Sequence, residues 1–146
     1  MKVLVLNGVN LDMLGQRDPA HYGRHTLADI EAMVRTLAGE LGVAVDFFQT
    51  NHEGAMCERL HRARGERPDA LLVNAGAWTH YSYAIRDALE LVEAPVYEVH
   101  LSDISKREPF RRHSVFEGLA RATVSGLGHG SYLEALRIAV REHGQR

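Results

Sequence analysis

The stretch Val3–Asn10 has the sequence VLVLNGVN: four apolar residues in a row, followed by a polar turn built around Gly8. A short, valine-rich and nearly continuous apolar run is typical of a strand buried on both faces of a parallel sheet. The pattern recurs in four further runs along the chain, Val43–Phe48, Ala70–Val73, Val96–Val99 and Ala122–Leu127. We therefore expect five strands in one parallel sheet.

Amphipathic segments separate these runs and carry helix signals at their ends. The first begins at Thr26, which can cap it, has Asp29 in its first turn and can end at Gly42. The other three are expected around Met56–Ala63, Ser82–Val92 and Ser131–Gly144, the last opening with the capping-box pair Ser131 and Glu134. Alternation of strands and helices predicts a doubly wound α/β fold, with residues 1–146 forming one domain.

Composition limits the classes of function. A net charge of −2 gives no electrostatic reason to expect nucleic acid or an anionic membrane as a partner. A single cysteine, Cys57, excludes an internal disulfide and fits a reducing compartment. The first apolar run ends at Asn7, too soon for the core of a signal peptide, and no run is long enough to span a membrane. We therefore expect a cytoplasmic protein.

Polar residues follow three of the predicted strands. Asn10 comes after the first, Asn74 ends the third, and His100 follows the fourth. In open α/β sheets, ligands bind beyond the carboxyl ends of the strands, so these side chains should converge on one crevice. Taken singly, each asparagine could be a turn residue beside a glycine, and His100 could be a satisfied core histidine. Their coincidence at strand ends favours an active site.

The long segment Gly8–Arg24 is the second candidate feature. A connection of this length is usually functional and often forms a lid. It carries Arg17 and Tyr22. A catalytic tyrosine needs its pKa lowered from about 10, and a nearby guanidinium does this by favouring the phenolate. The alternative, a packing tyrosine beside a solvated arginine, stays open at this level.

A basic run, Arg107–Ser114, is the third feature. It could be a solvated face, or it could clamp an anionic substrate or tune Tyr22, since guanidinium groups suit carboxylates. A helix starting after Leu101 and Ser102 would add backbone donors for a carboxylate. No metal is expected, because His52-Glu53 lacks a second histidine four residues on and nothing else has the spacing of metal ligands.

The most specific sequence pieces occur in a fixed order: Asn7–Leu11, Leu14–Pro19, Tyr22-Gly23, Asn74–Ala77, Thr79-His80, Arg86–Ala88, Glu98–Ser102 and Arg107–Ser114. Together they resemble the type II 3-dehydroquinate dehydratases of the shikimate pathway, which are small flavodoxin-like enzymes. The resemblance extends from Val3 to about Arg141. It implies a three-layer sandwich, a five-stranded parallel sheet flanked by helices, and a hydro-lyase that converts 3-dehydroquinate to 3-dehydroshikimate without a cofactor. This step serves either aromatic biosynthesis or quinate catabolism, and both roles stay open.

The resemblance also implies roles for individual residues. As tyrosinate, Tyr22 would remove a proton from the carbon next to the ketone, and Arg17 would depress its pKa and close the lid. His100, oriented by Glu98, would protonate the departing hydroxyl. The remaining assignments are Asn10 on a water that stabilises the enolate, Asn74, His80 and Arg111 on ring hydroxyls, the amides of Leu101 and Ser102 on the carboxylate, and Asp87 across a subunit contact. The family assembles as trimers that build a dodecamer.

The chain departs from the family pattern beside the ring-hydroxyl site. Val9 stands where proline is usual, Tyr81 replaces a small polar residue next to His80, and Trp78 adds bulk. These changes motivate one alternative, a paralogue that dehydrates a modified, for example amino, analogue. A second alternative is a non-catalytic flavodoxin-like binding module. The joint presence of a base and an acid argues against it, because a binding module needs neither.

Overall fold

The computed structural model describes residues 1–146 and contains one parallel sheet with the strand order β2-β1-β3-β4-β5. Its strands are β1 (Lys2–Asn7), β2 (Ala44–Gln49), β3 (Ala70–Asn74), β4 (Val96–Val99) and β5 (Ala122–Val124). Its helices are α1 (Pro19–Tyr22), α2 (Leu27–Leu41), α3 (Glu53–Glu66), α4 (Tyr83–Glu90) and α5 (Gly130–His143). This order is that of the flavodoxin-like doubly wound fold, as expected.

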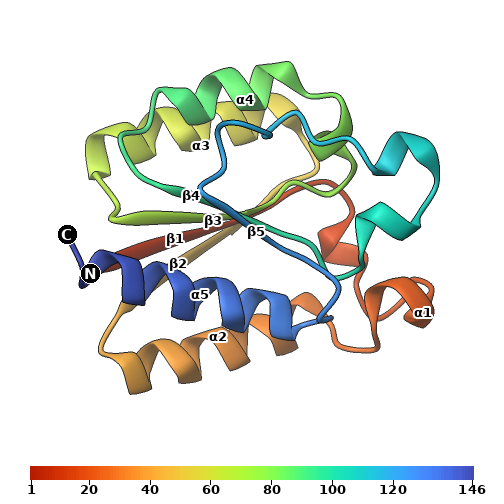
Figure 1. Ribbon diagram of the computed structural model, residues 1–146, viewed down its shortest axis with the longest axis horizontal. Helices are drawn as coiled ribbons and strands as arrows, with labels where there is room; N and C mark the ends of the chain where they lie inside the picture. The colour runs from red at the N-terminus through yellow and green to blue at the C-terminus, as the bar shows by residue number, and fades with distance from the viewer.

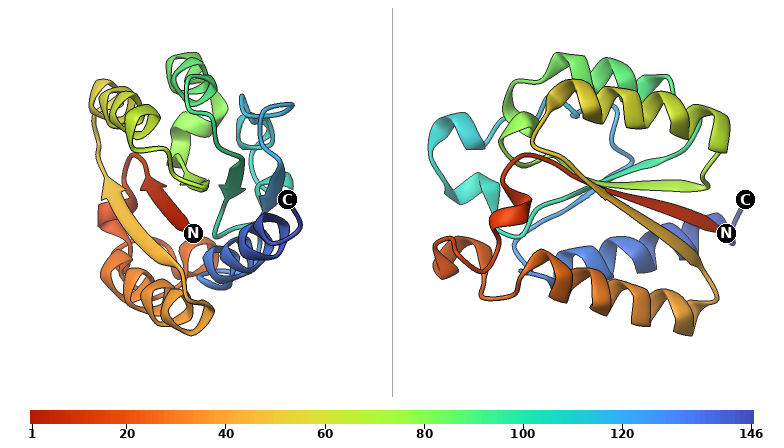
Figure 2. Two further views of the ribbon diagram at one scale, coloured as in Figure 1. Left: turned by 90° about the vertical axis from the view of Figure 1, so that its left-hand side faces the viewer. Right: turned by 180° about the vertical axis from the view of Figure 1, so that it is seen from behind.

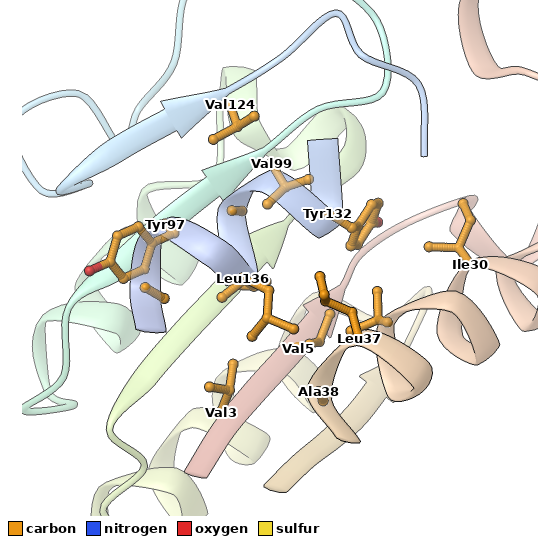
Figure 3. Packing of buried hydrophobic residues seen from close by; sticks show 14 of the residues in the cluster. Val3, Val5, Ile30, Leu37, Ala38, Tyr97, Val99, Val124, Tyr132 and Leu136 are labelled. Carbon is orange, nitrogen blue, oxygen red and sulfur yellow. The ribbon is translucent and has the colours of Figure 1, made fainter. Parts of the chain in front are cut away.

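The helices form two layers on the sheet, α3 and α4 on one face and α2 and α5 on the other (Figure 1). Successive side chains of β1 point to opposite faces of the sheet and so pack against both helix layers. Val3 and Val5 pack with the α2 and α5 side, while Leu4 and Leu6 pack with the α3 and α4 side. Figure 3 shows the first of these two cores, in which Leu136 of α5 and Leu37 of α2 meet over Val5. Burial on both faces explains the continuous apolar runs of β1, β3 and β4, whereas the edge strands β2 and β5 are only partly buried.

The predicted start and end of α2 are confirmed. Thr26 and Asp29 form a reciprocal capping box, and Gly42 ends the helix in a left-handed conformation with φ 69°. The predicted end of α5 is confirmed as well, because Gly144 is its C-cap, but the capping box predicted at its start is wrong. Ser131 lies inside the first turn, where its Oγ accepts a hydrogen bond from the Leu127 amide instead of capping the helix.

Two other expectations need correction. The last strand ends at Val124 and not at Leu127, because Gly126 turns the chain at φ 81° and Leu127 is exposed. The Gly8–Arg24 segment is not wholly irregular, since it contains the 3₁₀ helix η1 (Leu11–Met13) as well as α1. The remaining 3₁₀ helices are η2 (Gly76–His80), η3 (Ile104–Lys106) and η4 (Pro109–Arg111).

These short helices gather beyond the carboxyl ends of the strands, whereas both chain termini lie at the opposite end of the sheet (Figures 1 and 2). No helix is both long enough and apolar enough to cross a bilayer. The architecture therefore concentrates its irregular, polar segments at one end of the sheet, where the site is expected.

Candidate active site

A pocket opens at the carboxyl ends of β1, β3 and β4, with an empty volume of about 600 Å³. Nine of the residues selected from the sequence line it: Asn10, Arg17, Tyr22, Asn74, His80, His100, Leu101, Ser102 and Arg111. The structure adds Val9, Leu11, Gly76, Ala77, Ile104 and Arg107 to the lining. The convergence of strand ends that the sequence predicts is therefore confirmed.

Tyr22, at the end of α1, lies between two guanidinium groups. Arg17 stacks on its ring, with Cζ 3.7 Å from the ring centroid. Arg107 donates a hydrogen bond from Nη1 to the phenolic oxygen at 2.9 Å, and the same nitrogen donates to Ser102 Oγ at 3.3 Å. Two guanidinium groups thus contact this phenol, one on the face of its ring and one at its oxygen. The sequence singled out the run containing Arg107 but did not select that residue for the site.

His100 and Glu98 form a buried pair below the pocket. His100 Nε2 lies 2.8 Å from Glu98 Oε1, and the residues are 6% and 2% exposed. Ser114 Oγ and Thr123 Oγ1 also donate to the carboxylate, at 2.7 and 3.1 Å. Burial alone would raise the pKa of Glu98, but the hydrogen bond and charge of His100 and the two hydroxyl donors outweigh burial and lower it. Glu98 is thus held as a carboxylate beside the imidazole.

Asn10 occupies a left-handed turn at φ 66°. Its amide N–H donates to Asn51 Oδ1 at 2.9 Å, and Asn51 in turn donates to Asp12 Oδ2 at 3.1 Å. The Asn10 side chain makes no hydrogen bond within the protein and lines the pocket. It is therefore free to bind a ligand or a water.

Asn74 belongs to a buried polar network at the pocket floor. Its Nδ2 donates to Tyr132 Oη at 2.9 Å, and Tyr132 donates to Asn7 Oδ1 at 2.5 Å. Asn74 Oδ1 accepts the Gly76 amide at 3.2 Å. Asn7 is fully buried at the end of β1, so it is part of this network and not only a turn residue. Burial raises the pKa of Tyr132, which stays a neutral donor.

The opposite wall can hold a polar, anionic ligand. His80 Nδ1 lies 2.6 Å from the carbonyl oxygen of His113, so that nitrogen carries the proton and Nε2 is an acceptor. Burial lowers the pKa of His80 and favours this neutral form. The amides of Leu101 and Ser102 donate to no group within the protein. They precede only the three-residue η3, so the expected helix N-terminus is reduced to one short turn.

Arg111 lines the pocket as well, and Glu108 Oε2 lies 2.9 Å from its Nε. The basic run thus sends two arginines, Arg107 and Arg111, into the pocket, while Glu108–Phe110, Arg112 and His113 remain exposed.

Three selected residues lie elsewhere. Asp87 is exposed on α4 and does not line this pocket. Trp78 is buried in the core beneath α3 and α4, and Tyr81 is 58% exposed at the surface. The expectation that Trp78 and Tyr81 border the ligand is therefore wrong, and of the three departures only Val9 reaches the pocket.

One cavity at the end of an open α/β sheet contains a phenol flanked by cations and an imidazole bound to a carboxylate. This arrangement is typical of an enzyme that moves protons by general acid–base catalysis. No group of three histidine, cysteine, aspartate or glutamate side chains is placed to hold a metal ion.

Comparison with known proteins names the family. The chain belongs to the class II dehydroquinases, whose family model (Dehydroquinase class II) matches residues 1–140. It is 61% identical over 138 residues to the 3-dehydroquinate dehydratase of Pelobacter propionicus, covering 94% of this chain and 93% of the relative. It is 48% identical over 140 residues to the catabolic 3-dehydroquinase of Verticillium alfalfae, covering 96% and 93%. The crystal structure of the type II dehydroquinase from Butyrivibrio crossotus superposes with a TM-score of 0.92 at 37% identity, covering 95% of this chain and 97% of that one.

Proposed function

We propose that this chain is a hydro-lyase that dehydrates 3-dehydroquinate to 3-dehydroshikimate, with the Tyr22 phenolate as base and His100 as acid. The observation that carries this proposal is the arrangement around Tyr22, whose oxygen accepts a hydrogen bond from Arg107 while Arg17 covers its ring. A phenol that only packed in a lid would have no need of two cations. We further propose that residues 1–146 act as one catalytic domain in the cytoplasm.

The first step is removal of a proton from the carbon beside the ketone. The phenolate oxygen of Tyr22 takes the proton, and the electrons of the C–H bond form an enolate. Asn10, with its free side chain in the pocket, helps hold a water that donates to the enolate oxygen. Donors placed where charge develops stabilise the transition state. Arg17 closes the lid segment over the substrate and excludes bulk water.

The second step is loss of the hydroxyl group from the next carbon of the ring. The enolate electrons return, the carbon–oxygen bond breaks, and the imidazolium of His100 protonates the departing hydroxyl, which leaves as water. Glu98 holds the imidazole in position for this transfer. Proton removal and proton delivery account for every atom, so the reaction needs no cofactor.

Substrate groups fit the rest of the lining. The amides of Leu101 and Ser102 have no partner within the protein and can bind the carboxylate. Asn74, neutral His80 and Arg111 hold the ring hydroxyls, with His80 accepting through Nε2. The amino-analogue alternative has lost two of its three motivating residues, since Trp78 and Tyr81 lie outside the pocket.

The test is the ultraviolet absorbance of the conjugated product after addition of 3-dehydroquinate. Wild type should turn the substrate over, whereas Tyr22→Phe and His100→Ala should each lose at least about 100-fold in kcat. Borohydride with substrate should leave wild type active, because the only lysines, Lys2 and Lys106, do not line the pocket. Full activity of Tyr22→Phe would refute the assignment of the base, and strong preference for the amino analogue would refute the substrate.

We propose in addition that the enzyme works as a homododecamer built of trimers. The support is Asp87, which is exposed on α4 outside its own pocket and would complete the site of a neighbouring copy. Light scattering should give about 200 kDa, twelve times the 16.3 kDa of one chain. A monomer with full activity would contradict this assembly.

A further inference from the structure

One segment without regular secondary structure, His113–Glu117, touches both sides of the site. The carbonyl oxygen of His113 accepts from His80 Nδ1 at 2.6 Å. The next residue, Ser114, donates to Glu98 Oε1 at 2.7 Å, on the oxygen that also contacts His100. A displacement of this segment would therefore disturb His80 and the Glu98–His100 pair together.

The segment is anchored from outside the pocket by Arg86 of α4. Arg86 Nη1 donates to the carbonyl oxygens of Val115 and Glu117, at 2.5 and 2.9 Å. Its Nε lies 3.2 Å from Glu90 one helical turn on, and only 26% of the Arg86 side chain is exposed. Two carbonyls in a turn that offers them no backbone donor would be left unpaired without this guanidinium.

Other contacts hold the segment at its middle but not at these carbonyls. The Val115 amide donates to the Thr79 carbonyl at 2.8 Å, and the Val115 and Phe116 side chains are buried in the core on the α3 and α4 side. These contacts keep the segment in place as a whole. The carbonyl contacts of Arg86 hold the peptide groups that follow Val115 and Glu117, one and three residues beyond Ser114.

We propose that Arg86 is a positioning residue: by binding the carbonyls of Val115 and Glu117, it orients His113 and Ser114, and through them His80 and the Glu98–His100 pair. The inference rests on the proposed function of that pair. Arg86 does not line the pocket and does not contact substrate. It acts through the segment on two subsites at once, one for a ring hydroxyl and one for proton delivery.

This role predicts a defined kinetic signature. Arg86→Gln cannot donate from one nitrogen to both carbonyls in the same geometry, so kcat should fall about tenfold or more and KM should rise several-fold, because small misplacements of catalytic groups are costly. Ser114→Ala removes only the hydrogen bond from Ser114 to Glu98, so it should lower kcat with little change in KM. In the Arg86→Gln background, Ser114→Ala should lower kcat by a smaller factor than in wild type. Arg86→Lys, which keeps a cationic donor, should recover part of both losses.

The matched control is Glu90→Gln, which removes the helix ion pair of Arg86 and leaves its carbonyl contacts intact. We expect kcat and KM within about twofold of wild type, because exposed pairs of this kind contribute little. Circular dichroism and Tm are measured for each variant. If Arg86→Gln does not fold, Arg86→Lys replaces it. Its kcat should be lower and its KM higher than those of Glu90→Gln, by smaller factors than those expected for Arg86→Gln.

The inference is overturned if kcat and KM of the Arg86 variant equal those of Glu90→Gln. It is also overturned if Ser114→Ala lowers kcat by the same factor in the Arg86 variant as in wild type. The proposed function fails separately, by a wild type that does not dehydrate 3-dehydroquinate or by an active Tyr22→Phe. If wild type is active and Arg86→Gln leaves kcat and KM unchanged, the positioning role alone is rejected.

Discussion

Removing one hydroxyl group, in Tyr132→Phe, should destabilise the protein far more than an ordinary Tyr→Phe change. Tyr132 is 1% exposed, and its hydroxyl both accepts from Asn74 and donates to Asn7, which are themselves 4% and 0% exposed. Asn7 Nδ2 already lacks a partner, so the variant leaves Asn7 with no side-chain hydrogen bond. Water cannot replace the hydroxyl at a site this buried without a cavity to hold it.

The magnitude follows from the two polar groups that lose their partner. Each buried group left unpaired costs about 1–3 kcal/mol, so for two groups we expect a loss of about 2–6 kcal/mol in the free energy of unfolding. For a chain of this size, 1 kcal/mol corresponds to about 2–4 °C in Tm, which gives a decrease of roughly 4–24 °C. Because Asn74 lines the pocket, KM for 3-dehydroquinate should also rise.

Tyr97→Phe is the matched control. Tyr97 is also fully buried on the α2 and α5 side of the sheet, and its hydroxyl donates to Glu142 Oε2 at 2.6 Å. Glu142 keeps its contact with Arg121 and can be hydrated, so this variant should lose no more than about 1 kcal/mol. Urea unfolding and Tm are compared at one protein concentration, because assembly adds to stability. Equal losses for the two variants would refute the reasoning.

Three further predictions concern single contacts. The pKa of Glu98 is lowered in the folded protein, so its charged form stabilises the fold above its ordinary pKa of 4.5, and this contribution is lost as pH falls through the folded pKa. Between about pH 5 and 3, the free energy of unfolding in urea should therefore fall less steeply for Glu98→Gln than for wild type. Gly76→Ala should lose activity and several degrees of Tm, because φ is 62° and the added Cβ would lie 2.5 Å from the Val9 carbonyl oxygen, whereas Gly39→Ala in α2 should be neutral or stabilising. Thr26→Ala should cost about 1 kcal/mol by calorimetry, through loss of the capping box of α2, with kcat unchanged.

Most of the fold was accessible from local patterns. The apolar runs of β1, β3 and β4 follow from burial on both sheet faces, and the Thr26 cap follows from the need to satisfy free amides at the start of a helix. Ser131 was misassigned because the same Ser-x-x-Glu spacing also fits a helix that has already begun at Gly130. There, the tertiary contact of Ser131 with the Leu127 amide decides the role of the serine, and spacing cannot reveal it.

The site residues also fall into those that local sequence can predict and those that it cannot. Asn10, Asn74 and His100 could be predicted because the carboxyl ends of parallel strands must lie at one edge. Tyr22 and Arg17 had no such constraint, since the conformation of a loop depends on contacts distant in sequence. The hydrogen bond from Arg107 to Tyr22 joins residues 85 positions apart, and the one from Tyr132 to Asn7 joins residues 125 apart. No local pattern encodes these partners.

The position of the pocket follows from how β1 and β3 diverge. These strands are neighbours, with Asn7 in register with Asn74, yet the chain leaving β1 leads to α2 on one face and the chain leaving β3 leads to α4 on the other. The two connections separate and leave a crevice between them, whose floor is formed by the last residues of the strands. Apolar residues there would have no backbone or side chain above them to pack against, whereas asparagines can bond to Tyr132 from below and still offer polar groups to a ligand above. The polar ends of two otherwise apolar strands are therefore a consequence of the topology, and they are the local signal by which such a site can be recognised.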